Sequence, residues 1–563
     1  MKFTQMQYTR PDMKQTLAGY AEICTQIQAA ASGAAVVKAF ESFMQLSDTV
    51  ATAAELANIR HTQNVNDAFY EKEKDFFDEN APHMADAQLN VYRAALASPH
   101  KAALADKYGQ ILLDKMAIDV KSQSEEILPL MAEENALITA YEKLYASAQI
   151  DFDGKKLTVS QMSLYKQSPD AAVRRAAYEA EGTWWDAHRA QLDDIYDKMV
   201  QNRTQQAKAL GFDSYTQLGY IRMHRLGYSM DEISAYRTQI VQAIVPLAEK
   251  CKAAQAKRIG VDTLKFYDDS FVFADGNAMP KGTPDEILAA GKKMYTELSV
   301  ETAAFIRDMF DGELFDVLSR NGKAPGGYCT YIPNYKAPFI FSNFNATADD
   351  VDVLTHEAGH AFAAAVAADK QLPAVLREPG MESCEIHSMS MEFLTAPYHH
   401  LFFGEDTAKY EYAHAADAVC FLPYGTMVDE FQHIVYDNPT LTPDERNAAW
   451  AQLEKKYRPW LHFDNLPFYG RGAGWQRQLH IYECPFYYID YCLAQTVALQ
   501  FFTAHLQNAQ DAWQRYLALV NKAGTCTYTQ LVESAGFASP FVPGTLQHIA
   551  AQLDAWFTHN EVR

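Results

Sequence analysis

Five consecutive residues constrain the fold of this chain more than any other feature: His356-Glu357-Ala358-Gly359-His360. Two imidazoles four residues apart point the same way on an α-helix, where positions i and i+4 lie one turn apart. The motif therefore predicts a helix on which His356 and His360 bind one ion while Glu357 lies beside them. Such an arrangement is typical of a hydrolytic zinc site, in which the glutamate takes a proton from a water molecule made more acidic by the ion.

The residues around the motif favour this interpretation over a chance match. With 17 His in 563 residues, a chain of this composition contains H-E-x-x-H by accident in about 3% of cases. Thr347, followed by Asp349 and Asp350, predicts a helix N-terminus with acidic side chains in the first turn. Small and apolar residues continue to Ala368, so we expect a helix buried on most sides, in which Gly359 allows another backbone to approach closely.

A zinc ion in a hydrolase needs a third protein ligand, and segment 378–393 contains the candidates. Helical spacing after a Pro-Gly turn makes Glu385 a candidate ligand, with Glu392 two turns further on and placed to orient a histidine. Spacing alone does not choose between Glu382 and Glu385. We interpret His387 as a structural or supporting histidine, because it points away from Glu385 on the same helix.

A later segment, 480–491, offers hydrogen-bond donors for the oxyanion that forms when a carbonyl group is attacked. If the segment is helical, imidazole and phenol groups share one face, and Pro485 bends or starts the helix locally. These groups are His480, Tyr487, Tyr488 and Tyr491. An aromatic core helix is the alternative, and the metal motif upstream favours the catalytic interpretation.

These motifs resemble those of the thimet oligopeptidase and oligoendopeptidase F family of zinc peptidases, most closely its bacterial oligoendopeptidase branch. The resemblance rests on Thr355-His356-Glu357-Ala358-Gly359-His360, a glutamate 25 residues after the second histidine, and the later segment rich in His and Tyr. It implies a mainly α fold: a two-lobed helical metallopeptidase with a small β-sheet next to the active-site helix and a deep channel for unfolded peptides.

The resemblance also implies roles for individual residues. One zinc ion is expected to be held by His356, His360 and Glu385. Glu357 is expected to act as the general base. The oxyanion-binding groups are expected to be His480, Tyr488 and Tyr491. Because Pro485 and Tyr487 leave the register open by one residue, any of the three tyrosines can hold the principal role.

Helical periodicity dominates the rest of the chain, and no internal repeat is evident. We expect an N-terminal helical lobe at residues 1–200, a helical connecting region with short β segments at 201–320, and a zinc-binding catalytic lobe at 321–563.

Three short segments predict β-structure instead. Residues 150–159 predict a hairpin with an Asp-Gly turn, and residues 266–273 an extended stretch. Residues 336–345 predict a strand before the metal helix, in which Pro338 suits an edge position. An edge strand there could pair with an extended peptide, and a buried structural strand is the alternative.

Composition excludes several classes of function. A formal net charge of −22 disfavours nucleic acid and anionic membranes as partners, because a polyanion would be repelled. The glycine-rich segments lack the spacing of a nucleotide fingerprint, so no nucleotide cofactor is expected.

The eight cysteines form no C-x-x-C pair, the first residues have no apolar secretory core, and no run of about 18 apolar residues occurs. We therefore expect reduced thiols and a cytoplasmic location.

Together these observations predict a zinc metallo-oligoendopeptidase that hydrolyses internal bonds of short unfolded oligopeptides, with Glu357 as general base. A C-terminal dipeptidase or carboxypeptidase on a related scaffold is the alternative enzyme. A catalytically inactive peptide-binding protein is the alternative outside enzymes, and the intact Glu357 argues against it because holding the metal does not require that carboxylate. The sequence carries no signal for an oligomeric state.

Overall fold

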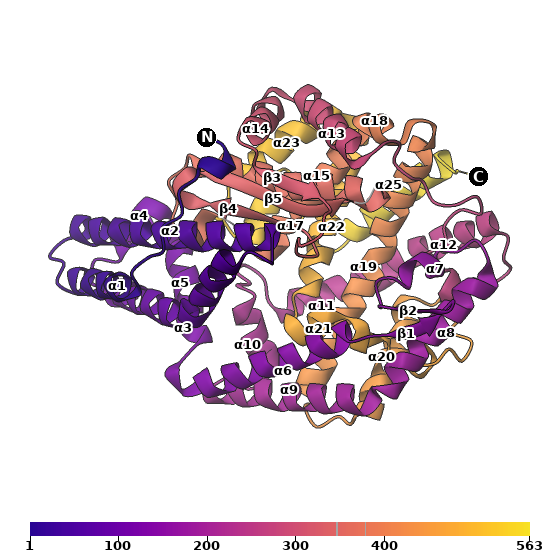
Figure 1. The fold of residues 1–563 in the computed structure, drawn as a ribbon, viewed down its shortest axis with the longest axis horizontal. Helices are drawn as coiled ribbons and strands as arrows, with labels where there is room; N and C mark the ends of the chain where they lie inside the picture. Colours follow the sequence, from indigo (N-terminus) through magenta and orange to yellow (C-terminus); the bar gives the residue numbers. More distant parts are fainter. Residues whose placement is uncertain (345–346, 378, 563) are drawn as a thin grey trace. The chain divides into compact units, whose positions relative to one another are not determined.

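The computed structural model describes residues 1–344, 347–377 and 379–562. The last residue of the predicted strand, Asn345, and the first residue of the predicted third-ligand segment, Glu378, lie outside the described residues. Helices dominate, and the β-structure of the described residues is one hairpin and one three-stranded sheet (Figure 1). The prediction of a mainly α fold with a small sheet is confirmed.

Residue contacts divide the chain into two compact units, each built from three segments. Unit 1 comprises residues 1–121, 279–407 and 497–538. Unit 2 comprises residues 122–278, 408–496 and 539–563. The lobes expected from the sequence, at 1–200, 201–320 and 321–563, remain a prediction, as does the substrate channel.

Unit 1 combines a bundle of long N-terminal helices with the sheet and the helices around it (Figure 1). In the bundle, α2 presents Val36, Phe40 and Phe43 at helical spacing, and all three are buried. The α-helices of unit 1 as a whole are α1 (Met13–Gln28), α2 (Gly33–Gln63), α3 (Ala68–Ala97), α4 (Ala102–Tyr108), α5 (Gln110–Ser122), α13 (Pro284–Leu298), α14 (Val300–Asp311), α15 (Ala348–Ala368), α16 (Ala374–Arg377), α17 (Met381–Leu394), α18 (His400–Phe403), α23 (Ala509–Val520) and α24 (Tyr528–Ser534).

The sheet of unit 1 has the strand order β3 (Phe315–Leu318), β5 (Ala337–Phe344), β4 (Tyr328–Ile332). β5 pairs antiparallel with β4 and parallel with β3, and α15 packs against β5 and β4. The strand prediction is confirmed, and of its two alternatives the buried structural strand is confirmed and the edge strand is wrong, because β5 lies between two strands and nearly all its residues are buried. Pro338 is tolerated because β3 pairs with β5 only from Ile340 onward, so β5 has one neighbouring strand at Pro338.

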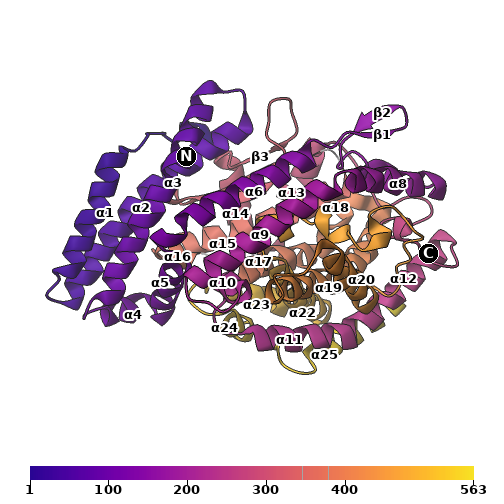
Figure 2. The same ribbon diagram turned by 90° about the horizontal axis from the view of Figure 1, so that it is seen from below.

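Unit 2 is helical apart from a hairpin, and α6 and α9 run side by side in it (Figure 2). Buried polar groups join these two helices: Arg203 Nε donates to Glu134 Oε1 at 2.5 Å. The α-helices of unit 2 are α6 (Leu128–Ala146), α7 (Ser163–Lys166), α8 (Ala171–Ala187), α9 (Arg189–Ala209), α10 (Tyr215–Arg222), α11 (Met230–Gln239), α12 (Val245–Ile259), α19 (Thr407–Asp437), α20 (Pro443–Tyr457), α21 (Leu479–Glu483) and α25 (Thr545–His559). α22 (Tyr488–Gln507) contributes its residues up to Thr496 to this unit.

The two other β predictions have different outcomes. The hairpin forms, with β1 (Ile150–Phe152) antiparallel to β2 (Lys155–Leu157), and its turn residues Asp153 and Gly154 have φ of 51° and 67°. The prediction of an extended stretch at 266–273 is wrong, because the chain makes a 3-10 turn at Phe266–Asp268. None of the described helices is long and apolar enough to span a bilayer.

Candidate active site

Helix α15 carries the two histidines and Glu357. It starts at Ala348 after Thr347 in the N-cap position, with Asp349 and Asp350 in the first turn, as predicted. Thr347 makes no side-chain capping hydrogen bond. The acidic residues are therefore left to offset the positive end of the helix dipole.

Gly359, inside the motif, allows α15 and α17 to pack closely. A Cβ atom on Gly359 would lie 2.6 Å from the backbone oxygen of His387 and 2.7 Å from the Cα of Ser388, both on α17. Any side chain at this position would push the helices apart, so the glycine is required by packing. The expected close approach of another backbone is confirmed, and it brings Glu385 of α17 beside the histidines of α15.

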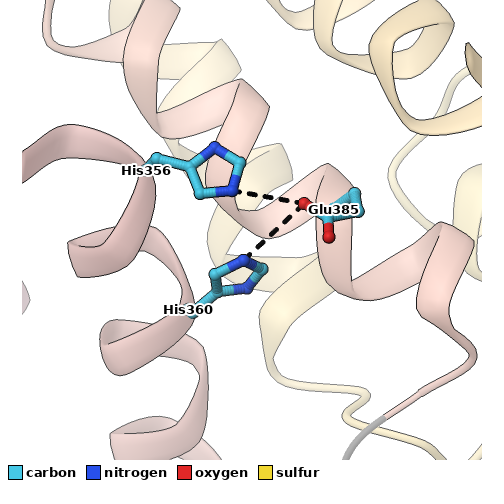
Figure 3. Close-up of side chains that lie close together, drawn as sticks. All are labelled: His356, His360 and Glu385. Carbon is cyan, nitrogen blue, oxygen red and sulfur yellow. Dashed lines mark ion pairs between the residues drawn. The ribbon is translucent and has the colours of Figure 1, made fainter. Parts of the chain in front are cut away.

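Three side chains from the two helices converge on one point (Figure 3). Glu385 Oε2 lies 3.3 Å from His356 Nε2 and 3.6 Å from His360 Nε2. Within the described residues these three side chains form a group whose possible ligand atoms all lie within 4.8 Å of one another. Two imidazole nitrogens and one carboxylate oxygen match the donor set of hydrolytic zinc sites, so the residues fit a zinc ion.

The structure distinguishes between the glutamates that the spacing left open. Glu385 reaches the histidines, whereas the carboxylate of Glu382 lies against Gly380: a Cβ atom on that glycine would be 2.6 Å from Glu382 Oε1. Glu382 therefore folds back over the start of its own helix.

Two neighbours on α17 hold the converging side chains in place. Glu392 Oε1 lies 2.8 Å from His356 Nδ1, as expected for a carboxylate that orients a histidine. Ser388 Oγ donates to Glu385 Oε2 at 3.1 Å. With Nδ1 engaged by Glu392, His356 directs its Nε2 towards Glu385.

Burial and charge set the protonation states of the metal-free group. Burial lowers the pKa of His360 to about 4, so this imidazole is neutral, the form that binds metal. Burial also lowers the pKa of His356, but its hydrogen bonds with Glu385 and Glu392 outweigh burial and hold that pKa well above its usual value. Burial raises the pKa of Glu357 to about 7. The carboxylates of Glu385 and Glu392 thus favour a positive charge at His356, and a bound cation would supply such a charge.

His387 is not part of the converging group. It is 3% exposed, and its Nε2 has no hydrogen-bond partner in the part of the chain that the structure describes. Its backbone oxygen accepts a hydrogen bond of 2.8 Å from the hydroxyl of Tyr516.

The predicted oxyanion-binding residues belong to unit 2. α21 ends at Glu483 and α22 begins at Tyr488, so segment 480–491 is not one helix: the chain turns at Pro485, where a bend was expected. The rings nevertheless gather around His480. Its ring centroid lies 4.9 Å from that of Tyr488, 5.8 Å from Tyr487 and 5.9 Å from Tyr491.

Residues of α10, the turn after it and α19 hold the turn between α21 and α22, and no motif in the sequence pointed to these residues. Phe486 has a φ of +68°, unusual for a residue with a side chain, and its N–H donates to Gln432 Oε1 at 2.9 Å. Arg225, with a side chain 1% exposed, donates to the Phe486 oxygen and to Asp490 Oδ1, the latter at 2.8 Å. A Cβ atom on Gly219 would collide with the Phe486 ring. These contacts fix the conformation from which the tyrosines extend.

Known proteins are similar to this chain over nearly its whole length. Residues 164–550 match the model of peptidase family M3, and residues 3–123 match the peptidase M3 N-terminal domain. A solved structure of PZ peptidase A with an inhibitor has a TM-score of 0.92 and 44% identity, and the match covers 99% of each chain. A structure from Bacillus anthracis assigned as an oligoendopeptidase F has a TM-score of 0.87 and 40% identity, covering 99% of this chain and 98% of the other.

Two more distant relatives are also named as an oligopeptidase and an oligoendopeptidase. Group B oligopeptidase PepB of Streptococcus agalactiae is 23% identical over 383 residues, which are 64% of this chain, and the match spans 59% of PepB. An oligoendopeptidase F homolog of Borreliella burgdorferi is 24% identical over 74% of this chain and 70% of its own. The resemblance read from the motifs is therefore confirmed, and this chain belongs to peptidase family M3, a family of peptide-bond hydrolases that includes the oligoendopeptidases F.

Proposed function

We propose that this protein is a zinc-dependent oligoendopeptidase that hydrolyses internal bonds of short unfolded peptides. One observation carries the proposal: His356 Nε2, His360 Nε2 and Glu385 Oε2 converge on one point in a chain of a peptidase family, and the Glu357 carboxylate interacts electrostatically with two of these residues. The names of the relatives, oligopeptidase and oligoendopeptidase, support short peptides as substrates and internal cleavage.

His356, His360 and Glu385 would hold the zinc ion, with Glu392 keeping His356 in its ligand orientation. When bound, zinc polarises the peptide carbonyl and lowers the pKa of water. Cobalt or manganese could replace it, because these donor types select only loosely among the ions.

Glu357 is the general base of the proposed reaction. Its carboxylate interacts electrostatically with His356 and Glu385, two of the proposed ligands, which supports its role in taking the proton from the attacking water and passing it to the leaving amine. Holding the metal needs only the other three residues, so the function of Glu357 can be removed separately.

His480 and the tyrosines around it are the proposed donors to the oxyanion. Burial raises the pKa of Tyr488 well above its usual value, which keeps its hydroxyl protonated and able to donate a hydrogen bond. We assign the principal role to Tyr488, whose ring is the nearest of the three to His480, with Tyr491 and Tyr487 as the alternatives.

We place the enzyme in the cytoplasm. All eight cysteines lie within the described residues as free thiols, which supports a reducing compartment.

Metal content and cleavage of a blocked peptide test the proposal together. The purified protein is analysed for metal by mass spectrometry, and an internally quenched peptide with both ends blocked is incubated with and without a chelator. We expect about one zinc per chain and chelator-sensitive internal cleavage. Zinc without cleavage of the blocked peptide would point to an exopeptidase or a binding protein, and a protein that takes up no zinc would overturn the metal site.

A further inference from the structure

Gln478 is hydrogen-bonded to His480 and has no part in the steps above. It lies between the 3-10 turn Gly474–Arg477 and α21, with an extended backbone of φ −80° and ψ 98°. From this position its side chain reaches forward to the first turn of α21, where Gln478 Nε2 lies 2.8 Å from His480 Nδ1. Both residues belong to unit 2.

The oxygen of the Gln478 side chain is held by Tyr424 of α19, also in unit 2. The hydroxyl of Tyr424 donates to Gln478 Oε1 at 2.7 Å. Burial raises the pKa of Tyr424 to about 12, so the hydroxyl keeps its proton and can donate. Among the residues that the structure describes, Gln478 is the only hydrogen-bond partner of this hydroxyl, so a reversed amide would take away the acceptor of its proton.

The direction of these hydrogen bonds fixes which nitrogen of His480 carries the proton. A neutral imidazole has one N–H donor and one acceptor nitrogen, and an amide NH₂ group can only donate. Because Gln478 Nε2 faces His480 Nδ1, that nitrogen accepts, and the proton of the neutral ring lies on Nε2. Nε2 is then the nitrogen that can donate a hydrogen bond to an oxyanion.

The backbone on either side of Gln478 is anchored to distant helices. Trp475 Nε1 donates to Asn447 Oδ1 of α20 at 2.9 Å. The hydroxyl of Tyr141 on α6 donates to the backbone oxygen of Gln476 at 2.8 Å. A side chain that extends from an anchored segment holds its hydrogen-bond geometry more strictly than one on a free loop.

Tyr424 also contacts Tyr488, the tyrosine to which we assign the principal oxyanion role. The two rings are perpendicular, with their centroids 5.8 Å apart. On its own ring Tyr424 carries the guanidinium of Arg458, 4.8 Å from the centroid. Tyr424 thus supports both kinds of proposed donor: Tyr488 by ring contact, and His480 through Gln478.

We propose that Gln478, oriented by Tyr424, is a positioning residue that keeps His480 in the tautomer with its proton on Nε2, so that His480 presents a donor to the oxyanion. The inference rests on the proposed peptidase function and deepens it by naming the residues that prepare His480 for its role. Gln478 acts through His480 and need not touch the substrate.

Nitrogen NMR reads the tautomer of His480 directly. The zinc-loaded protein is labelled with ¹⁵N in its histidine rings and studied at about pH 9, well above the ordinary histidine pKa of about 6.5. The signals of His480 are those that disappear in His480→Gln. We expect a protonated Nε2 and an unprotonated Nδ1, and a proton on Nδ1 in the wild type would overturn the proposal.

Gln478→Glu keeps the size of the side chain and its acceptor for Tyr424, but a carboxylate can only accept. His480 Nδ1 should therefore become protonated, and unchanged His480 signals would overturn the proposal. Tyr424→Phe leaves the amide free to turn and should give a mixture of tautomers. Tyr482→Phe is its matched control, since Tyr482 lies on α21 and its hydroxyl has no hydrogen-bond partner in the described part of the chain; it should keep the wild-type signals.

Kinetics test whether the tautomer matters for turnover. Gln478→Met removes the donor and keeps the length of the side chain. It should lower kcat by about 10-fold with little change in KM, less than the roughly 100-fold expected when an oxyanion donor is lost outright. In a His480→Ala background the same substitution should have no further effect on kcat. A fall of equal size in that background would mean that Gln478 does not act through His480.

The two kinds of measurement separate a failed inference from a failed function. A proton on Nε2 that moves in Gln478→Glu, without cleavage of the blocked peptide by the wild type, would refute the peptidase and support the control of the tautomer by Gln478. Cleavage by a wild type whose His480 carries its proton on Nδ1 would refute that control and support the peptidase.

Discussion

Replacing Gly359 by alanine tests whether the close contact of α15 and α17 sets the geometry of the proposed metal ligands. The added Cβ would lie 2.6 Å from the backbone oxygen of His387, and ordinary contact for such an atom begins at 3.4 Å. The helices must therefore separate locally by about 0.8 Å, the difference of these two distances, because the atoms in the way are backbone atoms that cannot rotate aside.

The effects on stability and on metal binding should differ in size. Overpacking costs about 1–3 kcal/mol, and the better helix propensity of alanine returns about 1 kcal/mol, so the free energy of unfolding should fall by only about 1 kcal/mol. Zinc ligands must keep their distances within about 0.2 Å. A displacement of Glu385 from the histidines that exceeds this tolerance should weaken zinc binding by on the order of 100-fold.

Two measurements decide the outcome. Zinc affinity is measured by competition with a chromophoric chelator, and the stability of the metal-free protein by thermal unfolding. Gly19→Ala is the matched control: Gly19 also lies within a helix, but its Cβ would meet only the end of the Leu46 side chain, at 3.0 Å. Wild-type zinc affinity in Gly359→Ala would refute the claim that this helix contact positions Glu385.

Three further substitutions test separate parts of the site. Glu357→Gln should keep its zinc, measured by mass spectrometry, while kcat falls by about 10³-fold, because the base is lost and the ligands remain; retained activity would contradict the assignment of the base. Glu392→Gln should weaken zinc binding by about 10- to 100-fold in chelator competition, since His356 Nδ1 loses its carboxylate partner; unchanged affinity would mean that this hydrogen bond does not support the ligand. Tyr488→Phe should lower kcat by on the order of 100-fold with little change in metal content, and a larger loss in Tyr491→Phe would transfer the principal oxyanion role to that residue.

Local spacing was enough to predict the metal helix, the hairpin turn and the face of α17 that carries Glu385 and Glu392. Each depends on residues within a few positions of one another, and the i, i+4 geometry of a helix or the φ > 0 requirement of an Asp-Gly turn is the same in any fold. For the same reason the motif identified the family: its residues must keep their spacing for the chemistry to work.

Only the tertiary structure decided the place of β5 in its sheet and the position of Glu385, because both depend on contacts between separate segments of the chain. The position of β5 at the centre of its sheet comes from pairing with β3, which ends at Leu318, and β4, which begins at Tyr328. That Glu385 rather than Glu382 lies beside the two histidines comes from the packing of α17 against Gly359.

The turn that presents Tyr488 shows the same dependence on distant residues. Its conformation at Phe486 is held by Arg225 and Gln432, which lie 261 and 54 residues away in the sequence. Hydrogen bonds and steric contacts at such separations leave no periodic pattern in the chain, because they are set by the packing of whole helices rather than by the spacing of residues along one of them.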